Sequence, residues 1–445
     1  MNAILTITRR AFRLAGIFLP SVVTAWVLLG GARPDRATRR DRWYARLVAA
    51  IERAGATFIK LGQIASSRPD LMPLDLCRHL AKLHDRAPAH SPAVSKQIVE
   101  DAFGSPLDAL FTRFDAEPLA SGSIAQVHRA MLRDGTDVAV KIRHPDARAM
   151  IETDLEIIGF FARQLDRLPT AKWLSFPEAA EQFGRSLHGQ LDLCDEARHL
   201  ERFRANFADR PEVHFPRPIE PYLHPTVIVE TFEEAEPLAK FLAAPHPANP
   251  RIARMGLGCF LQMIFRDGFV HADLHPGNLM VRLTGGDTEE GAQIVVLDCG
   301  MVAELPPHHR RNFTEFFSAI AAGDGRRAAE LMIIHAERHA CPDPAKFQDE
   351  MGALLLDARS RPIQEIEVAA ILSRILVLVR KHRIKIESAF TAVNVGIMVL
   401  EGVGRQLDPT VDLVREASPF LFTAMAELAR ERVLAQAAAE AAAAC

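Results

Sequence analysis

The segment that decides how this sequence is interpreted lies at residues 269–280 and reads FVHADLHPGNLM. It places His271, Asp273, His275 and Asn278 between apolar runs, which is compatible with a metal site, a catalytic loop or a surface turn. A zinc site would need both histidines on one helix, but Pro276 and the glycine after it end any helix at this point. The segment therefore favours a catalytic loop in which His271 is a packed scaffold residue.

Two further segments supply groups that suit the same chemistry. Twenty residues after Asn278, the segment VVLDCG places Asp298 directly after an apolar strand, and upstream the segment VAVK ends a strand with Lys141. A lysine can pair with phosphate oxygens, whereas Mg²⁺ prefers oxygen ligands and bridges phosphates. Asp273, five residues before Asn278, can orient a nucleophile. The order of these four groups predicts a protein-kinase type of site that binds ATP and Mg.

The hydrophobic pattern divides the chain into four regions. Residues 1–40 are predicted to associate with a membrane, and 41–113 form a helical extension. Residues 114–235 are rich in strands and predict a small N-terminal lobe, while 236–445 predict a larger lobe that is nearly all helical from Pro306 onward. The predicted fold class is α+β, with two kinase-like lobes and a helical N-terminal extension.

Two helices are predicted within the extension. The segment 41–68 shows helical periodicity that we expect to be interrupted at Gly55 and Gly62. The segment 91–103 is amphipathic, with Ser91 as its cap and proline at the first helical position.

The strand-rich region contains a predicted hairpin whose turn is Asp134-Gly135. Residues 225–232 read as a short buried strand, and 278–283 and 292–298 read as two strands joined by a polar loop. Helical periodicity is predicted from Ala147 to about Leu168 and again from Pro177 to Phe207.

Composition excludes several classes of protein. A net charge of −3 over 445 residues argues against a nucleic-acid-binding surface. The six cysteines are scattered and form no C-x-x-C pair, so neither a zinc ribbon nor a disulfide framework is indicated. Such cysteine usage fits a reducing cytoplasm.

The N-terminus departs from this soluble average. Residues 14–32 form a run of 19 residues without a charge, with arginines on both sides. The run just reaches the length of a spanning helix, although Pro20 would kink it. A signal peptide and a buried helix are the competing interpretations. Arginines between 33 and 46 would contact anionic headgroups and keep the chain in the cytoplasm, on the cytoplasmic face of the inner membrane in a bacterium.

Several motifs, in this order, resemble the UbiB (AarF-like) family of atypical protein-kinase-like proteins. The segment ATFIKLGQIASSRPDLMP at 56–73 is similar to the family's K-x-G-Q signature, with Lys60 and Gln63. PLASGSIAQVHRA at 118–130 is similar to its alanine-rich nucleotide loop, and VAVKIRHP, HADLHPGN and LDCG follow. The resemblance covers about residues 55 to 413.

The resemblance implies roles for individual residues. Lys141 would pair with the phosphates, Asp273 would be the catalytic-loop aspartate, and Asn278 and Asp298 would hold the metal. Lys60 and Gln63 would lie over the active site, where an ordinary kinase admits a peptide. The remaining nucleotide-binding residues would be Ala120, Ser121, Gly122, Ser123, Glu196 and Glu230. Small loop residues support that role, since they let backbone N–H groups approach phosphate closely.

By resemblance, the protein would act as an ATPase or atypical kinase that supports the biosynthesis of ubiquinone or another isoprenoid quinone at a membrane. Its partners would be ATP, a membrane lipid or isoprenoid-quinone precursor, and proteins of quinone biosynthesis, with no nucleic acid. The family's C-terminal membrane helices are not expected here, because the apolar run at 371–379 is short and contains Arg374.

Three positions depart from the family pattern. Gly122 moves the nucleotide loop toward the glycine-rich loop of ordinary kinases. Cys299 replaces the usual phenylalanine, and we expect it to be a small buried hydrophobe. Gln190 stands where a glutamate commonly pairs with the strand lysine, and it cannot neutralise Lys141. Glu196, six residues on, is the remaining glutamate of that motif.

Two alternative functions remain open from the sequence. A small-molecule kinase of the aminoglycoside or choline type would share the catalytic loop but lack K-x-G-Q. A pseudokinase scaffold would bind nucleotide without chemistry, and Gln190 and Cys299 are compatible with that interpretation. The four intact residues Lys141, Asp273, Asn278 and Asp298 argue against it.

Overall fold

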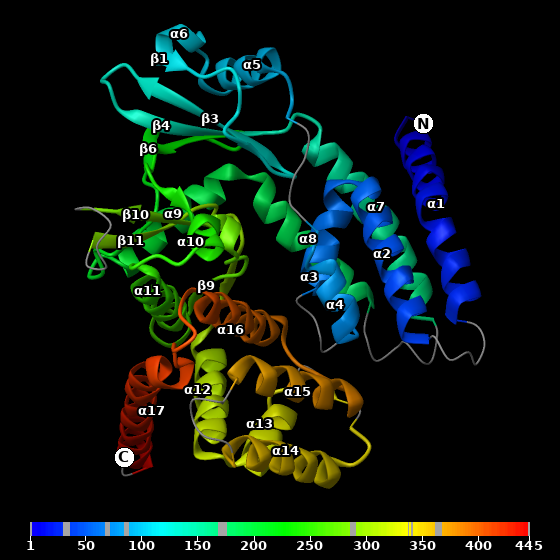
Figure 1. The fold of residues 1–445 in the computed structure, drawn as a ribbon, viewed down its shortest axis with the longest axis vertical. Coiled ribbons are helices and arrows are strands. Elements are labelled where there is room, and N and C mark those ends of the chain that lie inside the picture. Colours follow the sequence, from blue (N-terminus) through cyan, green and yellow to red (C-terminus); the bar gives the residue numbers. More distant parts are fainter. Residues whose placement is uncertain are drawn as a thin grey trace. The chain divides into compact units, whose positions relative to one another are not determined.

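A computed structural model describes residues 2–29, 36–66, 72–83, 89–167, 176–284, 291–336, 338–339, 341–360 and 367–443. The chain divides into two compact units. The N-terminal unit comprises residues 1–202 and 216–233, and the C-terminal unit comprises 203–215 and 234–445. Each unit is described by itself below, with elements labelled as in Figure 1.

The N-terminal unit begins with four helices. They are α1 (Asn2–Leu29), α2 (Arg36–Ala54), α3 (Ala56–Ser66) and α4 (Leu74–Leu80). Gly55 separates α2 from α3 as predicted, because its φ of 98° is a left-handed conformation that favours glycine. The predicted interruption at Gly62 is wrong, since α3 continues through it. A Cβ on Gly62 would lie 2.3 Å from the Cδ1 atom of Leu83, so this glycine serves close packing.

Helix α1 docks on the rest of the N-terminal unit through polar and apolar contacts, with Leu14 buried against Ala54 and Ile157. The guanidinium of Arg10 donates to the carboxylate of Asp154 (Nε–Oδ1 2.7 Å) and to the carbonyl of Ala54 (2.6 Å), at the end of α2. The indole of Trp43 donates to the carbonyl of Ser21 (2.9 Å). Other side chains of α1 are apolar and exposed: Leu5, Phe12, Leu19, Val22 and Val23.

Among the described helices, none combines the length and the apolar character needed to cross a bilayer. The uncharged run predicted at 14–32 belongs to α1 up to Leu29, and residues 30–35 lie outside the described part of the chain.

An antiparallel sheet forms the centre of the strand-rich region, in the order β1-β3-β4-β7-β6 with β2 beside β3. Its strands are β1 (Phe111–Phe114), β2 (Ala120–Ser121), β3 (Ala125–Leu132), β4 (Asp137–Arg143), β6 (Pro218–His224) and β7 (Val227–Thr231). The predicted hairpin turn at Asp134-Gly135 is confirmed, with Gly135 at φ 88° between β3 and β4. The alternating apolar residues of these strands pack with α5 (Pro92–Phe103) and α6 (Leu107–Leu110) in one core.

Three longer helices complete the N-terminal unit: α7 (Ala147–Leu165), α8 (Phe176–Leu191) and α9 (Leu193–Asn206), of which α9 ends in the C-terminal unit. The helical run predicted from Pro177 to Phe207 is therefore two helices. They separate at Asp192, whose carboxylate accepts the N–H of Cys194 (3.0 Å) and caps the start of α9.

Short strands organise the C-terminal unit. A four-stranded sheet has the order β5-β11-β10-β8, with β5 (Val213–His214), β11 (Ala292–Val296), β10 (Leu279–Leu283) and β8 (Glu236–Pro237). Two-stranded pairs are formed by β9 (Phe269–His271) with β12 (Val302–Glu304), and by β13 (Arg338–His339) with β14 (Ile384–Lys385). The two strands predicted around residue 280 and residue 294 are confirmed as the β10–β11 pair.

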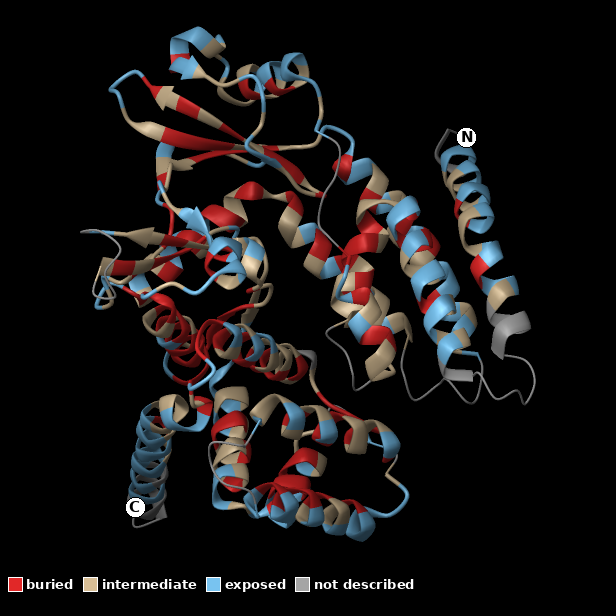
Figure 2. Ribbon diagram, in the orientation of Figure 1, coloured by how far each residue is buried: buried red, intermediate tan, exposed pale blue. Residues whose placement is uncertain are grey.

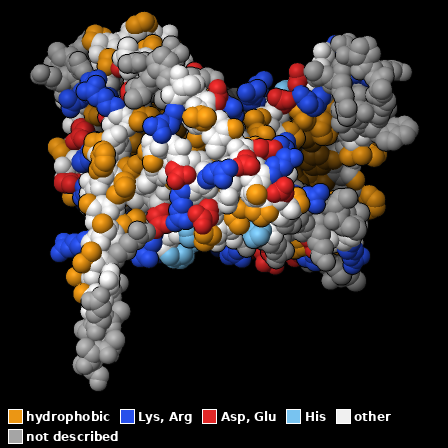
Figure 3. Space-filling view, turned by 90° about the horizontal axis from the view of Figure 1, so that it is seen from below, with side chains coloured by type: hydrophobic (Ala, Val, Ile, Leu, Met, Phe, Trp, Pro, Cys, Tyr) orange, Lys and Arg blue, Asp and Glu red, His pale blue; other side chains and the backbone are white. Residues whose placement is uncertain are grey.

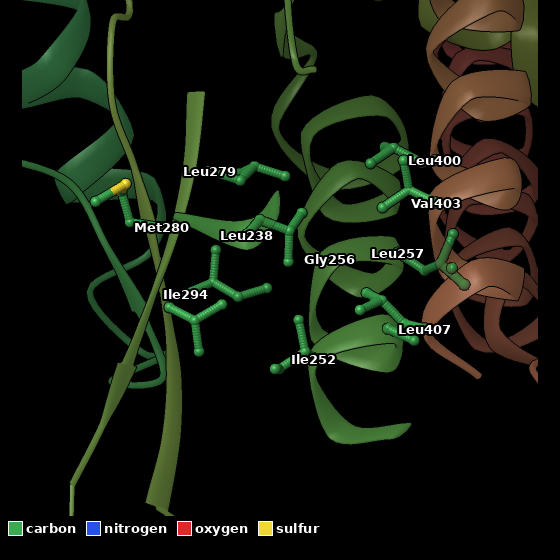
Figure 4. Close-up of a pocket in the computed structure, with 13 residues that line it drawn as sticks. Leu238, Ile252, Gly256, Leu257, Leu279, Met280, Ile294, Leu400, Val403 and Leu407 are labelled. Atoms are coloured by element: carbon green, nitrogen blue, oxygen red, sulfur yellow. The ribbon is translucent and has the colours of Figure 1, made fainter. Parts of the chain in front are cut away.

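Helices make up most of the C-terminal unit. They are α10 (Leu238–Ala243), α11 (Asn249–Gln262), η2 (Met263–Asp267), η3 (Pro276–Asn278), α12 (Pro307–Ala322), α13 (Gly325–Ile334), α14 (Pro344–Arg359), α15 (Val368–Lys381), α16 (Ser388–Leu407) and α17 (Leu413–Ala443). Helix α11 is buried along most of its length (Figure 2). A small pocket lined by apolar side chains and glycine lies between α11, the β10–β11 strands and α16 (Figure 4). The prediction of a nearly all-helical segment after Pro306 is confirmed.

The surface carries charges of both signs. On the face drawn in Figure 3, Lys and Arg side chains alternate with Asp and Glu among apolar and neutral groups. This pattern agrees with the small net charge of −3. The mixture of helices and mainly antiparallel sheets confirms the predicted α+β class.

Candidate active site

The predicted nucleotide loop is a tight turn between β2 and β3. Ala120 and Ser121 form β2, and Gly122, Ser123 and Ile124 link it to Ala125 at the start of β3. The N–H of Gly122 donates to the carbonyl of Ala125 (2.9 Å) and closes the turn.

The hydroxyl oxygen of Ser121 is buried and has no hydrogen-bond partner in the part of the chain that the structure describes. An unsatisfied buried hydroxyl is costly, so this atom fits a site whose polar partner is a ligand. The predicted loop therefore contains a buried polar atom that a ligand would satisfy, and its role at phosphate remains a prediction.

A buried ion pair lies beside this loop in the same unit. Lys141 stands in β4, opposite Val127 of β3, and its ammonium lies 2.6 Å from the Oε1 atom of Glu196 on α9. The two side chains are 13% and 5% exposed. The amide of Gln190 instead donates to the carbonyl of Ser186 in its own helix (3.2 Å). The lysine is thus neutralised by Glu196, and the substitution at Gln190 leaves the ion pair intact.

Glu230, the other acidic residue predicted at the nucleotide site, lies in β7 opposite Ala139 of β4. It is therefore on the strand next to the one that carries Lys141. Its role at the nucleotide remains a prediction.

The catalytic-loop segment in the C-terminal unit is held together by His271. The imidazole is buried, its Nδ1 atom accepts the N–H of Asp273 (3.2 Å), and its Nε2 atom donates to the carbonyl of Asp298 (3.1 Å). Burial lowers the pKa of His271 against the opposing pull of the two aspartates, which favours the neutral ring that this donor–acceptor pattern needs. The structure thus gives His271 the contacts of the scaffold residue that the sequence predicts.

Further hydrogen bonds gather the three polar residues of this segment. The side-chain amide of Asn278 donates to the backbone carbonyl of Asp273 (3.0 Å). The backbone carbonyl of Asn278 accepts the N–H of Leu297 (2.9 Å). Asp298 follows directly. Asp273, Asn278 and Asp298 therefore meet in one network, although they come from two separate stretches of sequence.

The backbone of Asp298 is left-handed, with φ 48°. Its Oδ1 atom accepts the N–H of Gly300 at 3.4 Å, a long contact. Cys299 is fully buried, as predicted for a small hydrophobe in place of phenylalanine. The residue therefore fills core space behind Asp298.

The zinc interpretation fails on geometry. His271 ends strand β9 and His275 is extended, so the two histidines do not share a helix. The Nδ1 atom of His275 accepts the N–H of Gly277 (2.9 Å). Within the described ranges, no group of three His, Cys, Asp or Glu side chains is arranged to hold a metal ion by protein ligands alone. Asn278 with Asp298 fits Mg²⁺ better, because Mg²⁺ usually takes one or two protein ligands and completes its shell with phosphate and water.

The K-x-G-Q residues lie on α3. Lys60 is only 5% exposed, so it is not a solvated surface lysine. The amide of Gln63 donates to the carbonyl of Leu83 (3.4 Å), which follows α4. That Lys60 and Gln63 lie over an active site remains a prediction.

Sequence reasoning missed a set of polar residues that surround the nucleotide loop: His90, Ser95, Gln126, His128 and His144. The segment SIAQVH contains Gln126 and His128, but its sequence does not indicate a hydrogen-bond partner for either side chain. The contacts of His90 with His144, of Ser95 with His128 and of Gln126 with His90 each join residues more than 30 positions apart, so no local pattern could have revealed them.

Comparison with known proteins identifies the family of this chain. Residues 82–332 match the model of the ABC1 atypical kinase-like domain, and 352–412 match that of the UbiB helical domain. A probable serine/threonine-protein kinase of Dictyostelium discoideum is 34% identical, over 93% of this chain and 68% of its own length. A mitochondrial ABC1 family protein of Schizosaccharomyces pombe is 31% identical, over 93% of this chain and 71% of its own.

Among solved structures, an erythromycin complex of a protein from Mycobacterium tuberculosis aligns with 78% of this chain and 91% of its own, at 19% identity and a TM-score of 0.48. The resemblance to the UbiB-like family and the predicted kinase-like fold class are confirmed by the two domain matches. Because the first match spans more than half of the sequence and the relatives align over nearly all of it, the chain belongs to the ABC1 atypical kinase-like family.

Proposed function

We propose that this protein binds Mg-ATP and acts as an ATPase or atypical kinase at a membrane, in support of isoprenoid-quinone biosynthesis. The observation that carries the nucleotide part is the buried ion pair between Lys141 and Glu196. In protein kinases, a strand lysine held by a helix glutamate positions the phosphates of ATP. Burying a lysine in this way beside a loop of small residues costs desolvation free energy. Binding of phosphate would explain why a lysine is found at this buried position.

The roles of the other residues follow from their positions. Backbone N–H groups of the loop at 120–123 would bind phosphate oxygens, and Asn278 and Asp298 would hold Mg²⁺. The ion would neutralise charge on the phosphates. Asp273, whose backbone is fixed by His271 and Asn278, would accept the proton of the acceptor hydroxyl or orient a water molecule.

The membrane part of the proposal rests on α1. Its exposed apolar side chains and the neighbouring Arg9 and Arg13 suit the interface of an anionic bilayer better than water. The Schizosaccharomyces pombe relative is described as mitochondrial, which fits a membrane-rich location. We propose attachment through the N-terminus with the catalytic units in the cytoplasm. A membrane lipid or quinone precursor would be the acceptor, and proteins of quinone biosynthesis would be partners.

The two alternatives are weaker. A small-molecule kinase of the aminoglycoside or choline type would lack K-x-G-Q, and the domain matches are to another family. The pseudokinase interpretation drew on Gln190 and Cys299. Glu196 supplies the ion pair that Gln190 cannot, and Cys299 is packed in the core.

The proposal is tested by the thermal shift that Mg-ATP produces. A ligand at 100 times its dissociation constant stabilises the folded protein by about 2.7 kcal/mol, so binding is measurable. We expect Asp298→Asn to lose most of the Mg-dependent shift while melting normally without nucleotide. Asp209→Asn, a change at an exposed aspartate of the same unit, is the matched control and keeps the shift. An equal shift in Asp298→Asn and wild type would remove Asp298 from the metal site.

Activity and the membrane role are tested together by phosphate release from ATP. We expect slow release that rises with vesicles containing anionic lipid, and none from Asp273→Asn. Deletion of residues 1–40 should keep the basal rate and lose the stimulation. Equal stimulation of the deletion variant would show that α1 is not the membrane contact.

A further inference from the structure

A cluster of histidine and amide side chains, which no step of the proposed reaction uses, adjoins the nucleotide loop in the N-terminal unit. His144 lies just past the end of β4, three residues after Lys141. Its backbone N–H donates to the carbonyl of Ile124 (2.8 Å), and its Nε2 atom bonds the carbonyl of Gly122 (3.0 Å). One residue therefore fixes two carbonyl groups of a turn that is only three residues long.

The direction of these bonds defines the protonation of the ring. Because the carbonyl of Gly122 can only accept, Nε2 of His144 carries the hydrogen. In a neutral ring Nδ1 is then an acceptor, and it lies 2.8 Å from the Nδ1 atom of His90. His90 must donate across this contact. The two rings thus form a chain of hydrogen bonds from His90 through His144 to Gly122. The chain is lost when both rings are protonated, because neither Nδ1 atom can then accept.

His90 is itself held in place. Its backbone N–H donates to Oε1 of Gln126 (2.8 Å), and its carbonyl accepts from Nε2 of the same side chain (3.3 Å). Gln126 is fully buried and lies on β3 opposite Ser121 of the nucleotide loop. The amide also bonds His128 (2.9 Å), whose other ring nitrogen bonds the carbonyl of Asp115 (2.9 Å). The segment just before α5 is therefore tied to the strand that follows the loop.

The surroundings of His90 keep it neutral. Its Nε2 atom is buried and has no partner among the described residues, so a proton there would be an unsatisfied buried donor. Burial, and then the neighbouring His144 and His128, lower the pKa of His90 to about 4. Asp115 and Glu117 act on His128, where burial outweighs them and lowers its pKa too. The hydrogen-bond chain is thus stable at neutral pH.

We propose that His144, held in one tautomer by His90, is a positioning residue that orients the nucleotide loop for phosphate. A peptide bond is planar and trans, so the N–H of residue 123 points opposite to the carbonyl of residue 122. When His144 holds the carbonyl of Gly122, the N–H of Ser123 is directed away from the histidine. The hydrogen bond to the side chain therefore sets the direction of a phosphate-binding donor, in a loop where Gly122 would otherwise move freely. This inference rests on the proposed binding of Mg-ATP.

The test compares His144→Ala, His144→Gln and His90→Ala with wild type. A glutamine amide can place an N–H near the position of the Nε2 atom, so His144→Gln should restore the bond to Gly122. We expect His144→Ala to raise the dissociation constant of Mg-ATP about fivefold, the value of one neutral hydrogen bond, with a smaller change in kcat. His90→Ala should have a weaker effect, because His144 can still adopt the correct tautomer part of the time. His224→Ala, a histidine whose ring bonds its own turn at Thr226, is the matched control.

Amide hydrogen exchange without nucleotide provides an independent measurement. Peptides that cover residues 118–126 should exchange faster in His144→Ala than in wild type, and His144→Gln should recover most of the protection. If wild type binds no Mg-ATP, the proposed function fails, whereas this exchange result still decides whether His144 restrains the loop. Unchanged exchange and unchanged affinity in His144→Ala would overturn the inference, as would an affinity loss that His144→Gln does not recover at all.

Discussion

The contact that docks α1 allows a sharp test, because it contains a fully buried carboxylate. Asp154 on α7 has no exposed surface, and Arg10 is 13% exposed. The guanidinium donates to both carboxylate oxygens (2.7 and 2.9 Å) and also to the carbonyl of Ala54. Arg10→Met would remove three hydrogen bonds and leave a buried charge without a partner.

The magnitude follows from this geometry. Removing one member of a buried ion pair costs about 3–5 kcal/mol, whereas a whole domain is stable by about 5–15 kcal/mol. The loss is thus large enough to release α1 without unfolding the sheet of the N-terminal unit. Replacing both members by apolar residues, Arg10→Met with Asp154→Leu, should recover most of the loss, because no charge then remains buried.

Urea unfolding and hydrogen exchange of α1 measure the effect. We expect Arg10→Met to lower the unfolding free energy by about 3 kcal/mol and to remove protection from α1 first. The control is Arg148→Met on α7, whose partner Glu152 is half exposed, and which should change stability by less than about 1 kcal/mol. If Arg10→Met is as stable as the control and α1 stays protected, the docking argument is wrong.

Three other predictions concern packing, pH and the K-x-G-Q segment. Gly256→Ala should stabilise α11 by about 1 kcal/mol in thermal unfolding, because the new methyl group meets only ordinary contacts. Gly396→Ala should destabilise the protein, because its Cβ atom would lie 2.2 Å from the ring of Phe260. The unfolding free energy should fall as the pH falls from about 6.5 to about 4. In this window His90 binds a proton in the unfolded chain but not in the folded protein, so His90→Gln should flatten the dependence of the unfolding free energy on pH. Lys60→Ala should leave the fold intact but change the rates of ATP hydrolysis and autophosphorylation. If both rates equal those of wild type, with and without vesicles, a role for Lys60 at the active site is contradicted.

Local pattern was sufficient wherever the deciding contacts are close in sequence. The turn at Asp134-Gly135, the break at Gly55 and the strands on either side of residue 285 each depend on a few neighbouring residues, and all were predictable. The order of the motif residues also predicted the network of Asp273 with Asp298, because resemblance to kinases supplied the long-range pairing. Gly62 was misjudged, since its reason is the close approach of Leu83, 21 residues away.

The partner of Lys141 shows why other features could not be predicted. Gln190 and Glu196 lie six residues apart, and only the break at Asp192 places the second on a new helix that reaches the lysine. The burial of Lys60 likewise depends on packing that the helical period does not specify. The sequence predicted the candidate site residues, and tertiary packing decided which of them meet.

The left-handed backbone at Asp298 restricts which amino acids this position accepts before any chemistry is considered. At φ 48°, glycine, asparagine and aspartate are tolerated, while other side chains cost about 1–2 kcal/mol. Alanine at this position would change the backbone and remove the proposed metal ligand at once, so a simple alanine scan would not separate the two effects. A saturation library at residue 298 can be sorted separately for protein abundance and for nucleotide binding. We expect Asp298→Asn and Asp298→Gly to be abundant but not to bind nucleotide. Variants with β-branched residues should be lost from both pools.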